Sequence, residues 1–149
     1  MKIENAIISS DQIKLIQETF STIEPSALIV AKTFYDKLFE LDPSLEELFS
    51  EDITPQRKKL MDMIGFLVYN LNDFDKLVGL IKALGQRHSH CYGVQDSSYE
   101  TAATAFLYAL EDNVGNAWTM KAKTAWGNLF KLVANLMTNN NHVEESITK

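Results

Sequence analysis

The chain has 149 residues, of which 46% are apolar, and its 14 basic and 20 acidic residues give a formal net charge of −6. This length is typical of a single domain with a substantial core, and the composition excludes a disordered chain. The acidic balance argues against binding to nucleic acid, because the densest basic cluster, Arg57 to Lys59, is only three residues long.

The single cysteine and the lengths of the apolar segments bear on where in the cell the protein is expected. Cys91 is the only cysteine and cannot form an intramolecular disulfide, which is typical of a reducing environment. Residues 1–10 lack the apolar core of a secretory signal, and no segment approaches the roughly 20 apolar residues of a membrane span. We therefore expect a cytoplasmic protein without a membrane partner.

The N-terminal half has the apolar spacing of helices, and no segment alternates as a strand does. A first helix is predicted to begin at Ser9 or Ser10, because Ser9 and Gln12 have the spacing of a capping box. A second helix is predicted from Pro25, in its first turn, to about residue 41. Pro43 is expected to open a short piece that ends near residue 50.

Four further helices are predicted in the rest of the chain. The first begins with Thr54 as its cap and Pro55 in its first turn, and reaches about residue 71. The second runs from Asn72 or Asp73 to residues 88–90, and the third from residue 96 or 97 to about 112. The last begins near Thr119 and fades into a polar tail at residues 139–141. The sequence thus predicts an all-α domain of six or seven helices.

His88 stands on a helical face that is otherwise apolar, after Leu77, Ile81 and Leu84 on the preceding turns. Taken alone, such a histidine is more often a core residue whose ring bonds to a backbone carbonyl. Neutral imidazole is also a preferred axial ligand of haem iron. Gln56, thirty-two residues earlier, opens a second apolar face. Two such faces favour a pocket for a flat, iron-bearing cofactor, with His88 as its metal ligand.

Several segments resemble the globin family. Residues 84–88 and 92–94 resemble its proximal segment, with His88 as the iron ligand, and residues 39–49 resemble the stretch that ends in its haem-stacking phenylalanine, here Phe49. Residues 56–61 resemble the start of the distal helix and place Gln56 at the position that faces the ligand; residues 125, 126 and 134 resemble the last helix. The chain is similar to bacterial single-domain haemoglobins and neuroglobin-like chains from about residue 13 to 137.

The resemblance implies an all-α globin fold of six to eight helices in a single domain over residues 1–149, with frayed ends at about 1–8 and 139–149. It also implies haem b (iron protoporphyrin IX) as cofactor. The resemblance also implies that Tyr35 and Gln56 form a distal pair similar to that of flavohaemoglobins. Their O–H and N–H groups would donate hydrogen bonds to the bound gas, which takes on negative charge. Without the resemblance, Tyr35 would be interpreted as a half-buried tyrosine with a surface hydroxyl. The residues expected to bind the cofactor are Phe39, Phe49, Lys59, Leu60, Leu84, Val94 and Tyr99. The alternative for Lys59 is a solvated position on the helix surface, and the alternative for the others is ordinary core packing.

Three features depart from the family pattern. The turn after His88 is one residue longer than in close relatives, which leaves His90 a minor alternative as ligand. Cys91 is expected to be an inert residue of that turn, with an intermolecular disulfide or a redox role as the weaker alternative. Flavohaemoglobins carry a glutamate beside the proximal histidine, where this chain has Asn141, and we expect no flavin or nicotinamide domain.

The expected function is reversible binding and transport of dioxygen and other small gases at a pentacoordinate iron, since the amide of Gln56 is a poor iron ligand. One alternative is a nitric oxide dioxygenase, active in nitric oxide detoxification, that depends on an external reductase. A second is a gas sensor that acts through a partner protein, and a third is a haem-free helical protein. We expect a monomer or a weak homodimer.

Overall fold

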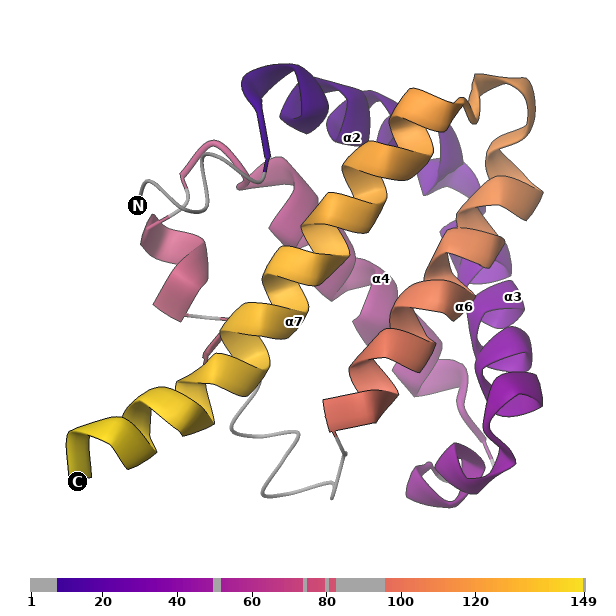
Figure 1. Cartoon of the computed structure of the whole chain (residues 1–149). Coiled ribbons are helices and arrows are strands. Elements are labelled where there is room, and N and C mark those ends of the chain that lie inside the picture. Colours follow the sequence, from indigo (N-terminus) through magenta and orange to yellow (C-terminus); the bar gives the residue numbers. More distant parts are fainter. Residues whose placement is uncertain (1–7, 50–51, 74, 80, 83–95, 149) are drawn as a thin grey trace.

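The structure is a computed structural model that describes residues 8–49, 52–73, 75–79, 81–82 and 96–148. In these ranges every regular element is a helix, which confirms the all-α prediction. Figure 1 shows the helices layered across one another around a common interior.

The first two helices differ in how they begin. α2 (Ser10–Ile23) begins as predicted, with Ser9 Oγ accepting from the backbone N–H of Gln12 and the Gln12 side chain accepting from that of Ser9. α3 (Ala27–Leu41) begins two residues later than predicted. Pro25 instead lies in a single 3₁₀ turn, η1 (Glu24–Ser26), and the backbone of Ser26, at φ −111° and ψ 26°, separates this turn from α3.

The next segment contains a capping residue that the sequence did not reveal. η2 (Pro43–Leu48) begins at Pro43 as predicted, and α4 (Thr54–Tyr69) has Pro55 in its first turn. Thr54 is not the cap that was predicted, because it is itself the first helical residue. The backbone N–H of Thr54 donates to Asp52 Oδ1 at 3.0 Å, so Asp52 satisfies this free donor.

The C-terminal half agrees with the predicted order. Residues 75–79 and 81–82 are helical, and the predicted end of that helix lies outside the described residues. α6 (Asp96–Val114) is followed by the 3₁₀ turn η3 (Gly115–Ala117), where Gly115 has a φ of 75° that favours glycine. α7 (Met120–Thr148) is capped by Thr119, and its backbone stays helical through residues 139–141, where a tail was expected.

The helices pack mainly in pairs. α3 packs along α6, α7 crosses α2, and α4 packs against α3 and α2 (Figure 1). Among the described helices, α4 does not pack extensively against α6 or α7. The largest fully buried side chains come from α2, α3, α4, α6, α7 and residue 77: Trp126, Phe20, Ile16, Ile23, Leu77, Leu110, Leu129, Val30 and Val68.

Candidate functional site

Three of the predicted site residues form one aromatic cluster, called here the aromatic wall: Tyr35, Phe39 and Phe49. The ring centroid of Tyr35 lies 5.5 Å from that of Phe49 and 5.9 Å from that of Phe39, and the two phenylalanine rings are 5.6 Å apart. Tyr35 is 5% exposed, whereas both phenylalanines are half-buried. α3 supplies two of these rings and the residue after η2 supplies the third, so their proximity depends on the fold.

The aromatic wall continues into the core through a series of ring contacts. Tyr35 contacts Phe34 at 4.9 Å, and Phe34 contacts Phe106 of α6 at 5.4 Å. Phe106 in turn stacks on Trp126 of α7 at 6.3 Å. Aromatic pairs at these separations attract each other beyond their burial, so the series ties the wall to the centre of the molecule.

The predicted residues of α4 lie on the helix that packs against α3. Gln56 and Leu60 are half-buried and one turn apart, so they share a face of α4. Lys59 is exposed, which suits both a position at the mouth of a pocket and a solvated helix surface. The structure thus brings Gln56 and Leu60 onto the helix next to the aromatic wall.

Tyr35 keeps its proton in this environment. Burial raises the pKa of its phenol to about 12, against an opposing effect of the positive charge of Arg57, which lowers it. The phenol is therefore neutral throughout the physiological range. A neutral phenol offers one O–H donor, which is the form required to bond to a ligand that carries negative charge.

Arg57 was missed as a site residue by the sequence reasoning, which treated it only as part of a basic cluster. It stands at the start of the buried face of α4, four, seven and eleven residues before Met61, Ile64 and Val68. Its Nε is buried and has no hydrogen-bond partner in the described part of the chain. The helical spacing could have revealed this arginine, because a cation rarely begins an apolar stripe.

The proximal side is only partly described. His88, Leu84 and Val94 lie outside the described residues, as do His90 and Cys91. Leu77 and Ile81, which the apolar face predicted to precede His88, are buried in the core. Tyr99, near the start of α6, is half-buried and packs against the core cluster.

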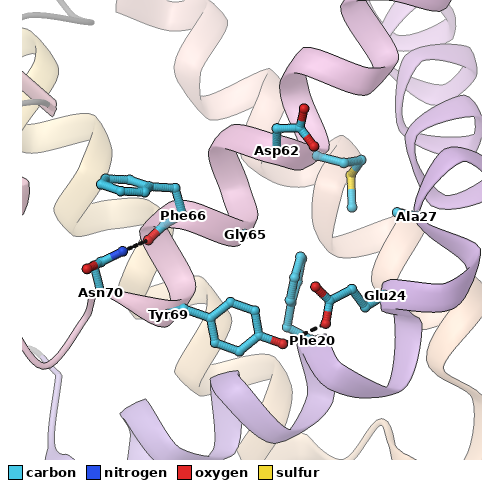
Figure 2. A pocket seen from close by; sticks show the side chains of 9 residues that line it. Phe20, Glu24, Ala27, Asp62, Gly65, Phe66, Tyr69 and Asn70 are labelled. Atoms are coloured by element: carbon cyan, nitrogen blue, oxygen red, sulfur yellow. Dashed lines mark hydrogen bonds between the residues drawn. The ribbon is translucent and has the colours of Figure 1, made fainter.

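A shallow hollow lies between α2 and α4, and none of the predicted site residues lines it. Figure 2 shows Tyr69, whose hydroxyl donates to Glu24 at 2.7 Å, and Gly65 on the near side of α4. The volume of this hollow is about 530 Å³. The residues that line it are Phe20, Glu24, Ala27, Met61, Asp62, Gly65, Phe66, Tyr69 and Asn70.

The donor set on the described side of the site fits a haem that carries a small ligand. Phe39 and Phe49 offer apolar ring surface that suits a flat, apolar cofactor. Tyr35 and Gln56 add an O–H donor and an amide N–H donor, groups that can form a hydrogen bond to a bound gas. The described residues therefore suit the cofactor that the sequence predicts.

Comparison with known proteins is consistent with this arrangement. The sequence model of the Globin family matches residues 32–137, a range that contains every predicted site residue. The chain is 26% identical to a protein named neuroglobin from Tetraodon nigroviridis, over 88% of this chain and 91% of that protein. It is also 26% identical to a neuroglobin from Danio rerio, over 83% of this chain and 86% of the relative. None of the helices within the described ranges combines the length and apolarity of a membrane span.

Proposed function

Because the chain belongs to the globin family, which implies binding of haem and small gases, we propose that it carries haem b and binds dioxygen reversibly. His88 is the axial ligand in this proposal, and Tyr35 and Gln56 are the residues that address the gas. The observation that carries the proposal is the buried, neutral phenol of Tyr35 within the aromatic wall.

Haem supplies an iron centre at which a small gas can bind reversibly. The chain's own residues determine how firmly the gas is held. The Tyr35 hydroxyl and the Gln56 amide would donate hydrogen bonds to a gas bound there, and in a site of low polarity such bonds are stronger than in water. Phe39 and Phe49 keep water away from these donors and provide a flat surface for the cofactor.

The coordination state follows from the residues on the two sides. The imidazole of His88 would hold the iron, and the amide of Gln56 would be a poor ligand for it. We therefore propose a pentacoordinate iron with a free position for the gas. The proposed pocket is of the flavohaemoglobin type because residue 35 is a tyrosine and residue 56 is a glutamine.

Haem reconstitution tests this function directly. Haem titrated into the haem-free protein should give a Soret band that saturates at one haem per chain, and the ferrous spectrum should change reversibly with oxygen pressure. The unliganded ferrous spectrum should be that of a high-spin, pentacoordinate iron. A protein that takes up no haem would overturn the proposed function, and a low-spin ferrous spectrum would overturn the coordination state.

Nitric oxide dioxygenase activity is a second candidate, supported by the same pairing of Tyr35 with Gln56. Nitric oxide, dioxygen and one electron combine to give nitrate in that reaction, and the electron must come from an external reductase. Sustained consumption of nitric oxide in the presence of a flavin reductase and NADH would support the enzyme. A single burst equal to the amount of protein would support gas binding alone.

A further inference from the structure

The hollow between α2 and α4 combines carboxylates with aromatic rings. Its nine lining residues include the carboxylates of Glu24 and Asp62 and the rings of Phe20, Phe66 and Tyr69, and they include no lysine or arginine. Figure 2 shows Glu24, Tyr69 and Phe20 on one side of the hollow and Asp62 on the other. A positively charged ligand placed between these two sides would therefore meet opposite charge on both.

The ring of Tyr69 is held beside one of these carboxylates. It packs edge-to-face on the buried ring of Phe20, with the ring centroids 5.7 Å apart, yet 46% of Tyr69 remains exposed. Its hydroxyl donates to the carboxylate of Glu24 at 2.7 Å. An aromatic ring and a carboxylate that are held together in this way both attract a cation, the ring through its π electrons and the carboxylate through its charge.

Two lysines of the chain already contact the rim of the hollow. Lys76 Nζ lies over the Phe66 ring, 5.6 Å from its centroid, and Lys58 Nζ pairs with Asp62 at 3.0 Å. Lys58 and Asp62 are 74% and 68% exposed, so their ion pair contributes little and can give way to a competing cation. Within the described ranges Glu24 takes part in no ion pair. The rim thus attracts cations, and its Glu24 side is the one that these lysines leave accessible.

We propose that this hollow binds a small organic cation of the quaternary ammonium class, with Glu24 and the Tyr69 ring as its main contacts. The methyl groups of such a cation suit apolar surface, and its charge suits ring faces and carboxylates. The volume of about 530 Å³ lies within the range of about 300–1,000 Å³ that is typical of small-molecule sites. A metal ion fits less well, because the described residues contain no group of three side chains that could hold one. The hollow shares no residue with the proposed gas-binding site, so this inference does not rest on haem.

The probes are choline and its neutral isostere, in which carbon replaces the charged nitrogen. Each is titrated into the full chain at constant ionic strength and followed by NMR at the backbone amides of Gly65, Phe66 and Tyr69. Choline should shift these signals to saturation, with a dissociation constant at least about fivefold below that of the isostere, the effect of one exposed charge or cation–π contact.

Three results of these titrations would overturn the inference. Equal affinity for choline and the isostere would mean that the hollow recognises apolar shape alone. Shifts that do not saturate with choline would mean that no site exists. Tighter binding of calcium than of choline at the same amides would indicate a metal site instead.

Substitutions of Tyr69 test the contribution of the ring. Tyr69→Leu keeps apolar bulk but removes the π electrons, so the dissociation constant for choline should rise about two- to fivefold. Tyr69→Phe keeps the ring and should bind choline as the wild type does. Equal losses in the two variants would overturn the role of the ring, because the hydroxyl would then explain both.

Glu24→Gln tests the carboxylate, since the amide oxygen can still accept from Tyr69 while the charge is gone. It should also weaken choline binding about two- to fivefold. Glu18→Gln is the matched control, because it removes the same charge from an exposed residue of α2 that does not line the hollow. Equal losses in Glu24→Gln and Glu18→Gln would overturn the inference, since net charge alone would explain them. Unchanged choline binding in both Glu24→Gln and Tyr69→Leu would overturn it as well.

Discussion

The indole N–H of Trp126 donates to Thr19 Oγ1 at 2.7 Å, where α7 crosses α2. Both side chains are buried, and the Thr19 hydroxyl itself donates to the backbone carbonyls of Leu15 and Ile16. This small network satisfies the one polar atom of the largest side chain in the core. It also fixes how the first and last described helices cross.

Removal of the Thr19 hydroxyl should destabilise the protein. In Thr19→Val the buried indole N–H loses its acceptor, so the free energy of unfolding should fall by about 1–3 kcal/mol. Urea denaturation of the haem-free protein, followed by circular dichroism, measures this change. Thr19→Ser keeps the hydroxyl and should lose less, and equal stability of wild type and Thr19→Val would contradict the argument.

The distal donors should slow the release of oxygen. Each charge-assisted hydrogen bond contributes roughly 1.5–3 kcal/mol, so Tyr35→Phe should speed oxygen dissociation by about ten- to a hundredfold. Stopped-flow dissociation measures this rate, and Gln56→Leu should also release oxygen faster. Tyr108→Phe, which changes an exposed ring of α6, is the matched control and should behave as wild type. Unchanged rates in both distal variants would refute their proposed role.

The proximal histidine can be identified by paired substitutions. His88→Ala should abolish or severely weaken haem uptake, because the iron loses its axial ligand, whereas His90→Ala should keep the wild-type Soret band. Haem titration of the two haem-free proteins measures the difference. The reverse result would assign the iron to His90 instead.

The buried phenol of Tyr35 should make the haem-free protein sensitive to alkali. Folding raises the pKa of Tyr35 from 10.0 to about 12, so its contribution to stability is complete below pH 10 and is lost as the pH rises through 12. Between these values the wild type should lose about 2 kcal/mol more than Tyr35→Phe does. Urea denaturation of both proteins at pH 9 and pH 11.5 gives the comparison, and parallel losses would argue against a buried phenol.

The sequence was sufficient for the elements whose signals are local. The capping box of Ser9 and Gln12 and the prolines at positions 43 and 55 mark helix starts that the structure confirms. The role of Asp52 at the start of α4 was missed, because an Asp two residues before a helix looks the same as a solvated one. Pro25 was assigned to the wrong helix type, since a 3₁₀ turn and an α-helical first turn accept proline equally.

The site was predictable only as a set of residues and not as an arrangement. Tyr35 and Phe49 were singled out through a family resemblance, but their ring contact depends on how η2 returns toward α3. Arg57 was overlooked because its neighbours Lys58 and Lys59 made it look like one more solvated cation. The sequence shows only that a cation begins an apolar stripe of α4, and the enclosure of its Nε depends on the fold.

Ring contacts join Trp126 through Phe106 and Phe34 to Tyr35. A phenol held in this way cannot swing aside while the interior stays intact. On warming, loosening of the tryptophan environment and faster escape of the gas should occur together, at a single midpoint. Tryptophan fluorescence and the fraction of gas that stays bound would then change at the same temperature.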